Sequence, residues 1–154
     1  MHPNVQAVKD ALAAAEAPGE IRVLPDAVAT AAAAAEALGV TVGQIANSLI
    51  FDADGDPLLV LTSGAHRVDP AKVAALIGAT LVKRATPDFV RRHTGQAIGG
   101  VAPVGHPKPV RTLVDTTLAG YDVVWAAGGI PHAVFPTSFA ELVRLTAGTP
   151  AEVA

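Results

Sequence analysis

The sequence predicts an α/β fold: a single compact domain in which a central mixed, largely antiparallel sheet is flanked by helices. Three observations predict it. The chain has 154 residues, a one-domain length that suffices to bury one hydrophobic core. Segments with helical spacing alternate irregularly with short apolar runs, which does not fit repeated βαβ crossovers. The pair Asp54-Gly55 separates two of these runs and is a strong hairpin signal.

Five segments are predicted to form helices. In residues 4–17, apolar side chains recur every three or four positions, and Pro18-Gly19 ends the segment. The other helices are marked by a capping Thr, Asp or Ser before them, in two cases with Pro at the first helical position, and by glycines after three of them. The predicted helices are 4–17, 31–38 after Thr30, 71–77 after Asp69-Pro70, 87–93 after Thr86, and 139–146, which Ser138 and Glu141 open as a capping box.

The remaining apolar runs are predicted to be strands, with 44–51 and 58–62 forming the central hairpin. The acidic turn between these two strands resembles the start of a calcium loop. Gly55 stands at its fourth position instead of the sixth, however, and Ser63 takes the place of the final Glu, so calcium is not expected. The predicted strands are 21–24, 44–51, 58–62, 80–83, 97–99, 110–114, 122–126 and 133–135.

Composition excludes several classes of protein. Hydrophobic residues make up 51% of the chain and charged residues only 16%, which excludes a wholly disordered protein. The absence of cysteine excludes a disulfide framework, thiol catalysis and thiolate zinc sites, and it favours a cytoplasmic location. No apolar run approaches the roughly 20 residues of a membrane-spanning helix. Asp10 and Glu16 interrupt the region where a signal peptide would need an apolar segment, so no leader is expected.

The formal net charge of −3 hides an uneven distribution. Residues 63–115 carry eight basic side chains against three acidic ones, whereas residues 1–62 carry two basic and eight acidic side chains. A basic middle block in an acidic protein is typical of a local phosphate-binding face, because attraction to a polyanion depends on the local field. The alternative is an ordinary solvated surface.

The most unusual local sequence is the glycine- and proline-rich segment 97–109. Its glycines allow a ligand to approach the bare backbone, and its prolines fix the shape of the loop. Such a loop can direct several N–H groups at one oxygen, either of a phosphate or of the oxyanion that forms when an ester carbonyl is attacked. It lacks the Gly-Lys-Ser/Thr of a P-loop and the glycine spacing of a dinucleotide fingerprint. The alternative is a purely structural turn.

Side chains for other chemistries are poorly placed. The five histidines form no metal-ligand spacing, so neither a metal nor another cofactor is expected. His66, His106 and His132 lie in predicted loops, where they could carry a proton or serve only the structure. No serine has the Gly-x-Ser-x-Gly context of a hydrolase elbow. Tyr121 and Trp125 could stack on a base, but their strand context also suits a core.

Several segments follow one another in an order that matches a known family, and the chain resembles the YbaK/ProX family of bacterial aminoacyl-tRNA editing deacylases. These enzymes are related to the editing insertion of prolyl-tRNA synthetases. The resemblance runs from about residue 30 to residue 145. It rests on the segments Asn47-Ser-Leu-Ile-Phe51, Arg67-Val-Asp69, Thr94-Gly95, Gly99-Gly-Val-Ala-Pro-Val-Gly105, Asp115 and Ala127-Gly-Gly129.

The resemblance implies an α/β domain that hydrolyses the ester joining a wrongly attached amino acid to a tRNA 3′ end. The family's Gly-x-x-x-Pro loop binds the aminoacyl ester, and here it would be formed by Gly99, Gly100, Val101, Ala102 and Pro103. Backbone N–H groups would then stabilise the oxyanion, so that no side-chain nucleophile is needed. Bulky replacement of Gly100 is therefore expected to abolish deacylation while leaving folding largely intact.

One departure from the family concerns charge. Asn47 stands where the family usually has Lys, and its short neutral amide can neither reach as far nor neutralise an anion. With the resemblance, the expected catalytic residues are Asn47 and the loop 99–103. The other expected substrate-binding residues are Ser48, Ser63, Gly64, Arg67, Gly105, His106, Asp115, Gly128 and Gly129. The expected tRNA-binding residues are Lys83, Arg84, Arg91, Arg92 and Lys108, and the missing charge could come from His106, Lys108 or Arg67.

Three functions remain open. The leading one is a freestanding cytoplasmic deacylase that removes a mischarged small amino acid from tRNA. The second is a non-catalytic module that has lost the family lysine and binds tRNA ends, nucleotides or a synthetase. The third is an esterase acting on a small non-RNA ester. The expected partners are aminoacyl-tRNA and an aminoacyl-tRNA synthetase, whereas a membrane, DNA and a cofactor are not expected.

Overall fold

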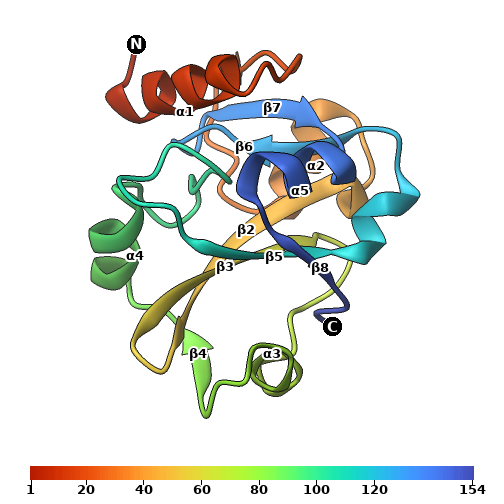
Figure 1. The fold of residues 1–154 in the computed structure, drawn as a ribbon. Helices are drawn as coiled ribbons and strands as arrows, with labels where there is room; N and C mark the ends of the chain where they lie inside the picture. Colours follow the sequence, from red (N-terminus) through yellow and green to blue (C-terminus); the bar gives the residue numbers. More distant parts are fainter.

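The computed structural model describes residues 1–154 and contains one mixed sheet of eight strands (Figure 1). The strands are β1 (Arg22–Val23), β2 (Ile45–Ala53), β3 (Asp56–Ser63), β4 (Val82–Arg84), β5 (Arg111–Asp115), β6 (Val124–Ala127), β7 (Ala133–Thr137) and β8 (Thr149–Ala151). Their order is β1-β7-β6-β2-β3-β5-β8, and β4 pairs with β2 beside this path. Four pairings are antiparallel and three are parallel, which confirms the predicted mixed sheet.

The central hairpin is confirmed. Ala53 pairs with Asp56, which leaves Asp54-Gly55 as a two-residue turn with φ of 52° and 95°, the left-handed backbone of a type I′ turn. The carboxylate of Asp54 accepts hydrogen bonds from the N–H groups of Thr80 and Leu81, both at 2.8 Å. These contacts hold the turn against the chain that enters β4, and they lower the pKa of Asp54.

One predicted strand is wrong and one strand was not predicted. Residues 97–99 form a turn, because Gly99 has φ of +91° and the N–H of Gly100 donates to the carbonyl of Ala97 at 3.1 Å. Strand β8 pairs parallel with β5 although it contains Pro150, which cannot donate a backbone hydrogen bond and is tolerated at the edge of a sheet.

The five predicted helices are all present: α1 (Pro3–Ala14), α2 (Ala31–Leu38), α3 (Pro70–Ile77), α4 (Pro87–Thr94) and α5 (Phe139–Thr146). The caps form as predicted, for example at Thr30, whose Oγ1 accepts from the N–H of Ala33 at 3.1 Å. Two details differ. Helix α1 ends at Ala14, three residues early. Only half of the capping box at α5 forms, since Ser138 accepts from Glu141 N–H while the Glu141 carboxylate pairs with Arg144.

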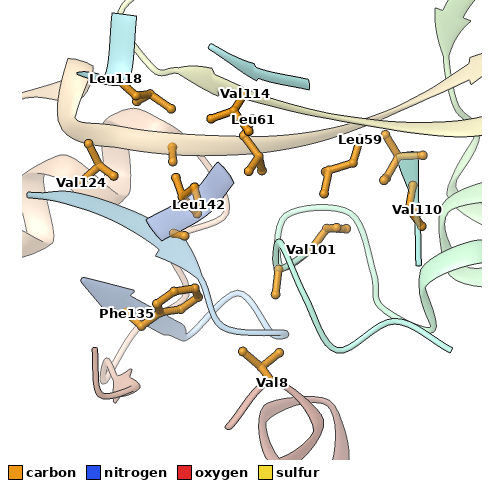
Figure 2. Close-up of a cluster of buried hydrophobic side chains, with 14 of the residues drawn as sticks. Val8, Leu59, Leu61, Val101, Val110, Val114, Leu118, Val124, Phe135 and Leu142 are labelled. Carbon is orange, nitrogen blue, oxygen red and sulfur yellow. The ribbon is translucent and has the colours of Figure 1, made fainter. Parts of the chain in front are cut away.

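Both faces of the sheet are covered by helices. On one face, Leu59 and Leu61 of β3 belong to one buried hydrophobic cluster with Val8 of α1, Leu142 of α5 and Val101 of the glycine-rich segment (Figure 2). Helix α4 packs against this cluster as well. On the opposite face, alternate residues of β2 and β3 pack against α3, and Ile45 packs against α2. No helix is long and apolar enough to cross a membrane.

Candidate functional site

The pairing of β2 leaves an opening in the sheet. This strand pairs with β3 from Ala46 to Ala53, but its other edge pairs with β6 only at Ile45 and Ala46 and with β4 only from Phe51 to Ala53. Residues 47–50 therefore have no strand on that edge. A pocket of about 270 Å³ occupies this opening, and its lining is mostly hydrophobic. We call it the β2 pocket.

The two faces of β2 contribute different residues to the β2 pocket. Successive side chains of a strand point to opposite faces. Ala46 and Ile50 belong to the core cluster of Val90 and Val101, so Ser48 between them faces the side of the glycine-rich loop. Asn47 and Leu49 face the other side, where α2 lies. The pocket thus connects both faces, and the loop shares its face with Ser48 rather than with Asn47.

Two amides of the expected cradle have no hydrogen-bond partner in the protein. Gly99 and Val101 line the pocket, and neither N–H makes a hydrogen bond within the protein. The other amides of the expected cradle are occupied: Gly100 N–H donates to Ala97, and Ala102 N–H donates to the buried side chain of Gln96 at 2.7 Å. Pro103 has no N–H. Within the expected cradle 99–103, only Gly99 and Val101 therefore have an N–H group free to donate to an oxyanion. The N–H of Ile98, which also lines the pocket, is unpaired as well.

Gly100 serves packing. A Cβ atom at this position would lie 2.6 Å from the carbonyl carbon of Ile130 and 2.8 Å from the nitrogen of Pro131. Gly128 and Gly129 lie in the same turn as Ile130 and Pro131, between β6 and β7. They do not line the β2 pocket. The expectation that a bulky residue at Gly100 would leave folding intact is therefore wrong, because main-chain atoms fill the space.

A second polar cluster lies where β3 and β5 end. The buried carboxylate of Asp115 accepts hydrogen bonds from the N–H groups of Ser63 and Thr117, both at 2.9 Å, and lies 3.0 Å from His66 Nε2. Ser63 Oγ donates to the carbonyl of Gly43 at 2.8 Å. None of these residues lines the β2 pocket, nor do the neighbouring Gly64 and Arg67. The structure thus places four expected substrate-binding residues, Ser63, Gly64, Arg67 and Asp115, outside the pocket.

The side chains that were expected to supply a positive charge also lie elsewhere. His106 Nε2 is 2.7 Å from the carbonyl of Ala102, and burial lowers the pKa of this imidazole, although the hydrogen bond opposes the shift. His106, Lys108 and Arg67 do not line the β2 pocket, and neither does Gly105. Arg84 of β4 is the only charged residue that does, and its guanidinium lies 5.8 Å from the centre of the Phe51 ring.

Of the five expected tRNA-binding residues, only Arg84 lines the β2 pocket. Lys83 and Arg84 lie on β4, Arg91 and Arg92 on α4, and all four are exposed, as is Lys108. None of them forms an ion pair within the protein, so their charges remain available to an anion. Val90 of α4 lines the β2 pocket, which places the basic residues of α4 near its border.

Sequence reasoning missed the outer wall of the pocket. This wall consists of residues 28–31 and Ala34 at the start of α2, together with Pro131 and Val134. For residues 28–34, the sequence predicted only the helix 31–38 capped by Thr30. Trp125, which was interpreted as a core or stacking residue, is half-buried and lines the pocket. The guanidinium of Arg22 lies over its ring, 5.0 Å from the ring centre. No group of three or more His, Cys, Asp or Glu side chains could hold a metal ion.

Comparison with known proteins gives a consistent result. Residues 25–145 match the aminoacyl-tRNA editing domain family. The chain is 36% identical over 91 residues to the proline–tRNA ligase of Nitratidesulfovibrio vulgaris (strain DP4), a match that covers 59% of this chain but only 16% of the ligase. It is 31% identical over 115 residues to the uncharacterized protein YwhH of Bacillus subtilis (strain 168), covering 74% of this chain and 73% of YwhH.

Two solved structures share the fold over almost their whole length. One is a candidate trans-editing enzyme for prolyl tRNA synthetase, with a TM-score of 0.92, 41% sequence identity, and coverage of 99% of this chain and 98% of that one. The other is the hypothetical protein APE2540, with a TM-score of 0.89, 29% identity, and coverage of 96% and 98%.

Proposed function

The chain belongs to the aminoacyl-tRNA editing domain family, and from this premise we propose that it is a cytoplasmic trans-editing deacylase that hydrolyses the ester of a mischarged small amino acid on tRNA. The observation that carries the proposal is the β2 pocket, a mostly apolar cavity bordered by the unpaired amides of Gly99 and Val101. Apolar walls suit a small aliphatic side chain, and the two unpaired N–H groups suit an acyl oxygen.

The reaction needs a positioned carbonyl. Water attacks the acyl carbon, the vicinal ribose hydroxyl can assist by hydrogen bonding, and negative charge develops on the carbonyl oxygen. The N–H groups of Gly99 and Val101 donate to this oxygen; in other enzymes each such donor contributes about 10²–10³-fold to the rate. The bond from the acyl carbon to the ribose oxygen then breaks, and the ribose oxygen takes a proton. After water attack, the products are the free amino acid and deacylated tRNA.

The exposed basic residues would hold the rest of the substrate. Lys83, Arg84, Arg91, Arg92 and Lys108 are exposed and unpaired, and cationic side chains bind phosphates by releasing counterions. Binding should therefore weaken steeply with salt. An esterase acting on a small non-RNA ester would instead show turnover that hardly responds to salt or to loss of these residues.

A second candidate function is a non-catalytic module that binds tRNA ends, nucleotides or a synthetase. It is favoured by one observation: Asn47 is neutral, faces away from the glycine-rich loop, and stands where the family usually has Lys. Arg84 is then the only charge in the pocket lining. The variant Asn47→Lys separates the two functions. If the natural protein is inert and the lysine variant gains activity, the binding module is the correct interpretation.

The main experiment is a deacylation panel with purified protein and tRNAs that carry different small amino acids. Ala29 is exposed, lines the pocket, and its Cβ lies 3.1 Å from the position of a Cβ on Gly99. The variant Ala29→Phe should obstruct the pocket and lower kcat/KM at least tenfold. Ala27→Phe is the matched control, because Ala27 is also exposed but does not line the pocket. Equal activity of both variants would contradict the assignment of the pocket.

A further inference from the structure

Ser48 is an unusual residue of the β2 pocket. Three buried polar side-chain atoms in the protein have no hydrogen-bond partner, namely Ser48 Oγ, His66 Nδ1 and Thr137 Oγ1. Of these, only Ser48 lines the pocket. A buried hydroxyl without a partner loses its hydration and gains nothing in return, so its presence calls for an explanation. A ligand that completes its hydrogen bonding would provide one.

The backbone of Ser48 is also unsatisfied on the same edge. Peptide groups of alternate residues in a strand point to opposite edges. The carbonyl of Ile45 accepts from Gly64, which follows β3, whereas the carbonyl of Ile50 accepts from Ala85, which follows β4. Ser48 is two residues before Ile50, so its N–H and C=O point to the same edge of β2 as those of Ile50. This is the open edge, where no strand is paired with Ser48. Ser48 therefore presents two oxygen acceptors to the pocket, its Oγ and its carbonyl, in addition to its backbone N–H.

The chemistry of the pocket indicates which group these acceptors bind. An aminoacyl ester carries an α-ammonium group, which has three donors and no acceptor. No Asp or Glu lines the pocket, so this cation finds no carboxylate there. Thr30 Oγ1 already accepts from Ala33 N–H, and Asn47 faces the other side of the sheet. Ser48 shares its face with Gly99 and Val101, where the acyl carbonyl would lie, and the α-carbon is directly bonded to that acyl carbon.

We propose that Ser48 is the residue that recognises the α-ammonium group of the aminoacyl moiety, through Oγ and the backbone carbonyl. This inference rests on the proposed function and identifies the feature that distinguishes an aminoacyl ester from an ordinary acyl ester. Ser48 is a binding residue and not a nucleophile. No histidine lines the pocket, and no side chain accepts a hydrogen bond from Ser48 Oγ that could activate it.

The test uses two non-hydrolysable ligands, 3′-deoxy-3′-alanylamino-adenosine and its 3′-propionylamino counterpart, which lacks only the amine. Isothermal titration calorimetry gives the affinity of each ligand for the wild-type protein and for Ser48→Ala. Hydrogen bonds to a charged group correspond to about a tenfold effect or more. The variant should weaken the alanyl ligand about tenfold and leave the propionyl ligand unchanged. Thr137→Val is the matched control, since it removes another unpartnered buried hydroxyl outside the β2 pocket.

Stability provides a second readout. Because Ser48 Oγ has no partner in the protein, Ser48→Ala should unfold at the same temperature as the wild type or higher. A loss of selectivity in a variant that is no less stable cannot come from damage to the fold. Equal weakening of both ligands, no change for either, or failure of the wild-type protein to bind the alanyl ligand would overturn the proposal. If the alanyl ligand binds as expected but alanyl-tRNA is not hydrolysed, only the proposed deacylation fails.

Discussion

Gly100 provides a sharp test of how the glycine-rich loop is held. In the variant Gly100→Ala, the new Cβ would lie 2.6 Å from the carbonyl carbon and 2.7 Å from the Cα of Ile130, and 2.8 Å from the nitrogen of Pro131. All three are main-chain atoms, which cannot rotate away as the end of a side chain could. The turn 128–131 and the loop must therefore separate.

The cost can be bounded from this geometry. Overpacking by one methyl group in a tightly packed site destabilises a protein by about 1–3 kcal/mol. Alanine offsets about 0.4–1 kcal/mol of this cost by restricting the unfolded chain. A net loss of about 1–2 kcal/mol corresponds to a Tm lower by about 2–8 °C for a domain of this size. Gly120→Ala is the matched control: a Cβ there meets nothing within 4 Å, so this variant should be as stable as the wild type or slightly more stable.

Urea unfolding followed by the fluorescence of Trp125, the only tryptophan, measures both variants. Deacylation is then assayed at a temperature where all proteins are folded. The displaced loop should misplace the amides of Gly99 and Val101 and lower kcat. Unfolding of Gly100→Ala at the wild-type urea concentration would refute the argument, because it would mean that the two segments separate without cost.

Two further predictions concern buried polar groups. Asp115→Ala leaves the buried N–H of Ser63 without its acceptor and should lower the free energy of unfolding by about 3–5 kcal/mol. Asp115→Asn should lower this free energy by a smaller amount. Equal urea midpoints for the wild type and both variants would contradict the prediction. Burial lowers the folded-state pKa of His106 below the ordinary value of 6.5, so the stability gained by its neutral form is present above that pH and is lost as pH falls through the folded pKa. His106→Gln should therefore flatten the fall in unfolding free energy between about pH 7 and pH 5; parallel curves for variant and wild type would show that other groups cause the fall.

Local features of this fold could be predicted from the sequence, because the forces that produce them act over a few residues. The caps at Thr30, Asp69 and Thr86 and the turn at Asp54-Gly55 are of this kind. The prediction of a strand at 97–99 was wrong because it gave more weight to the apolar residues than to the glycines, which favour a turn. Strand β8 could not be predicted, since its pairing with β5 depends on segments more than 30 residues apart.

The site was predictable only in part for the same reason. The resemblance identified Ser48, Gly99 and Val101, and these residues do line one pocket. It also grouped them with Ser63 and Asp115, which lie in a separate structural cluster. Which member of a motif contacts the pocket depends on strand parity and on where β4 and β6 stop pairing with β2, and neither is visible in the sequence.

The short pairing of β2 with β4 and β6 has a consequence for solubility. Exposed strand edges invite foreign strands and lead to self-association. Here the uncovered stretch is only four residues long and is blocked at both ends by neighbouring strands of the same sheet, so another polypeptide has no room to add itself. The unpaired backbone N–H and C=O groups of β2 are thus accessible to a ligand as small as an acyl chain, but they do not promote aggregation as the groups of a longer exposed edge would.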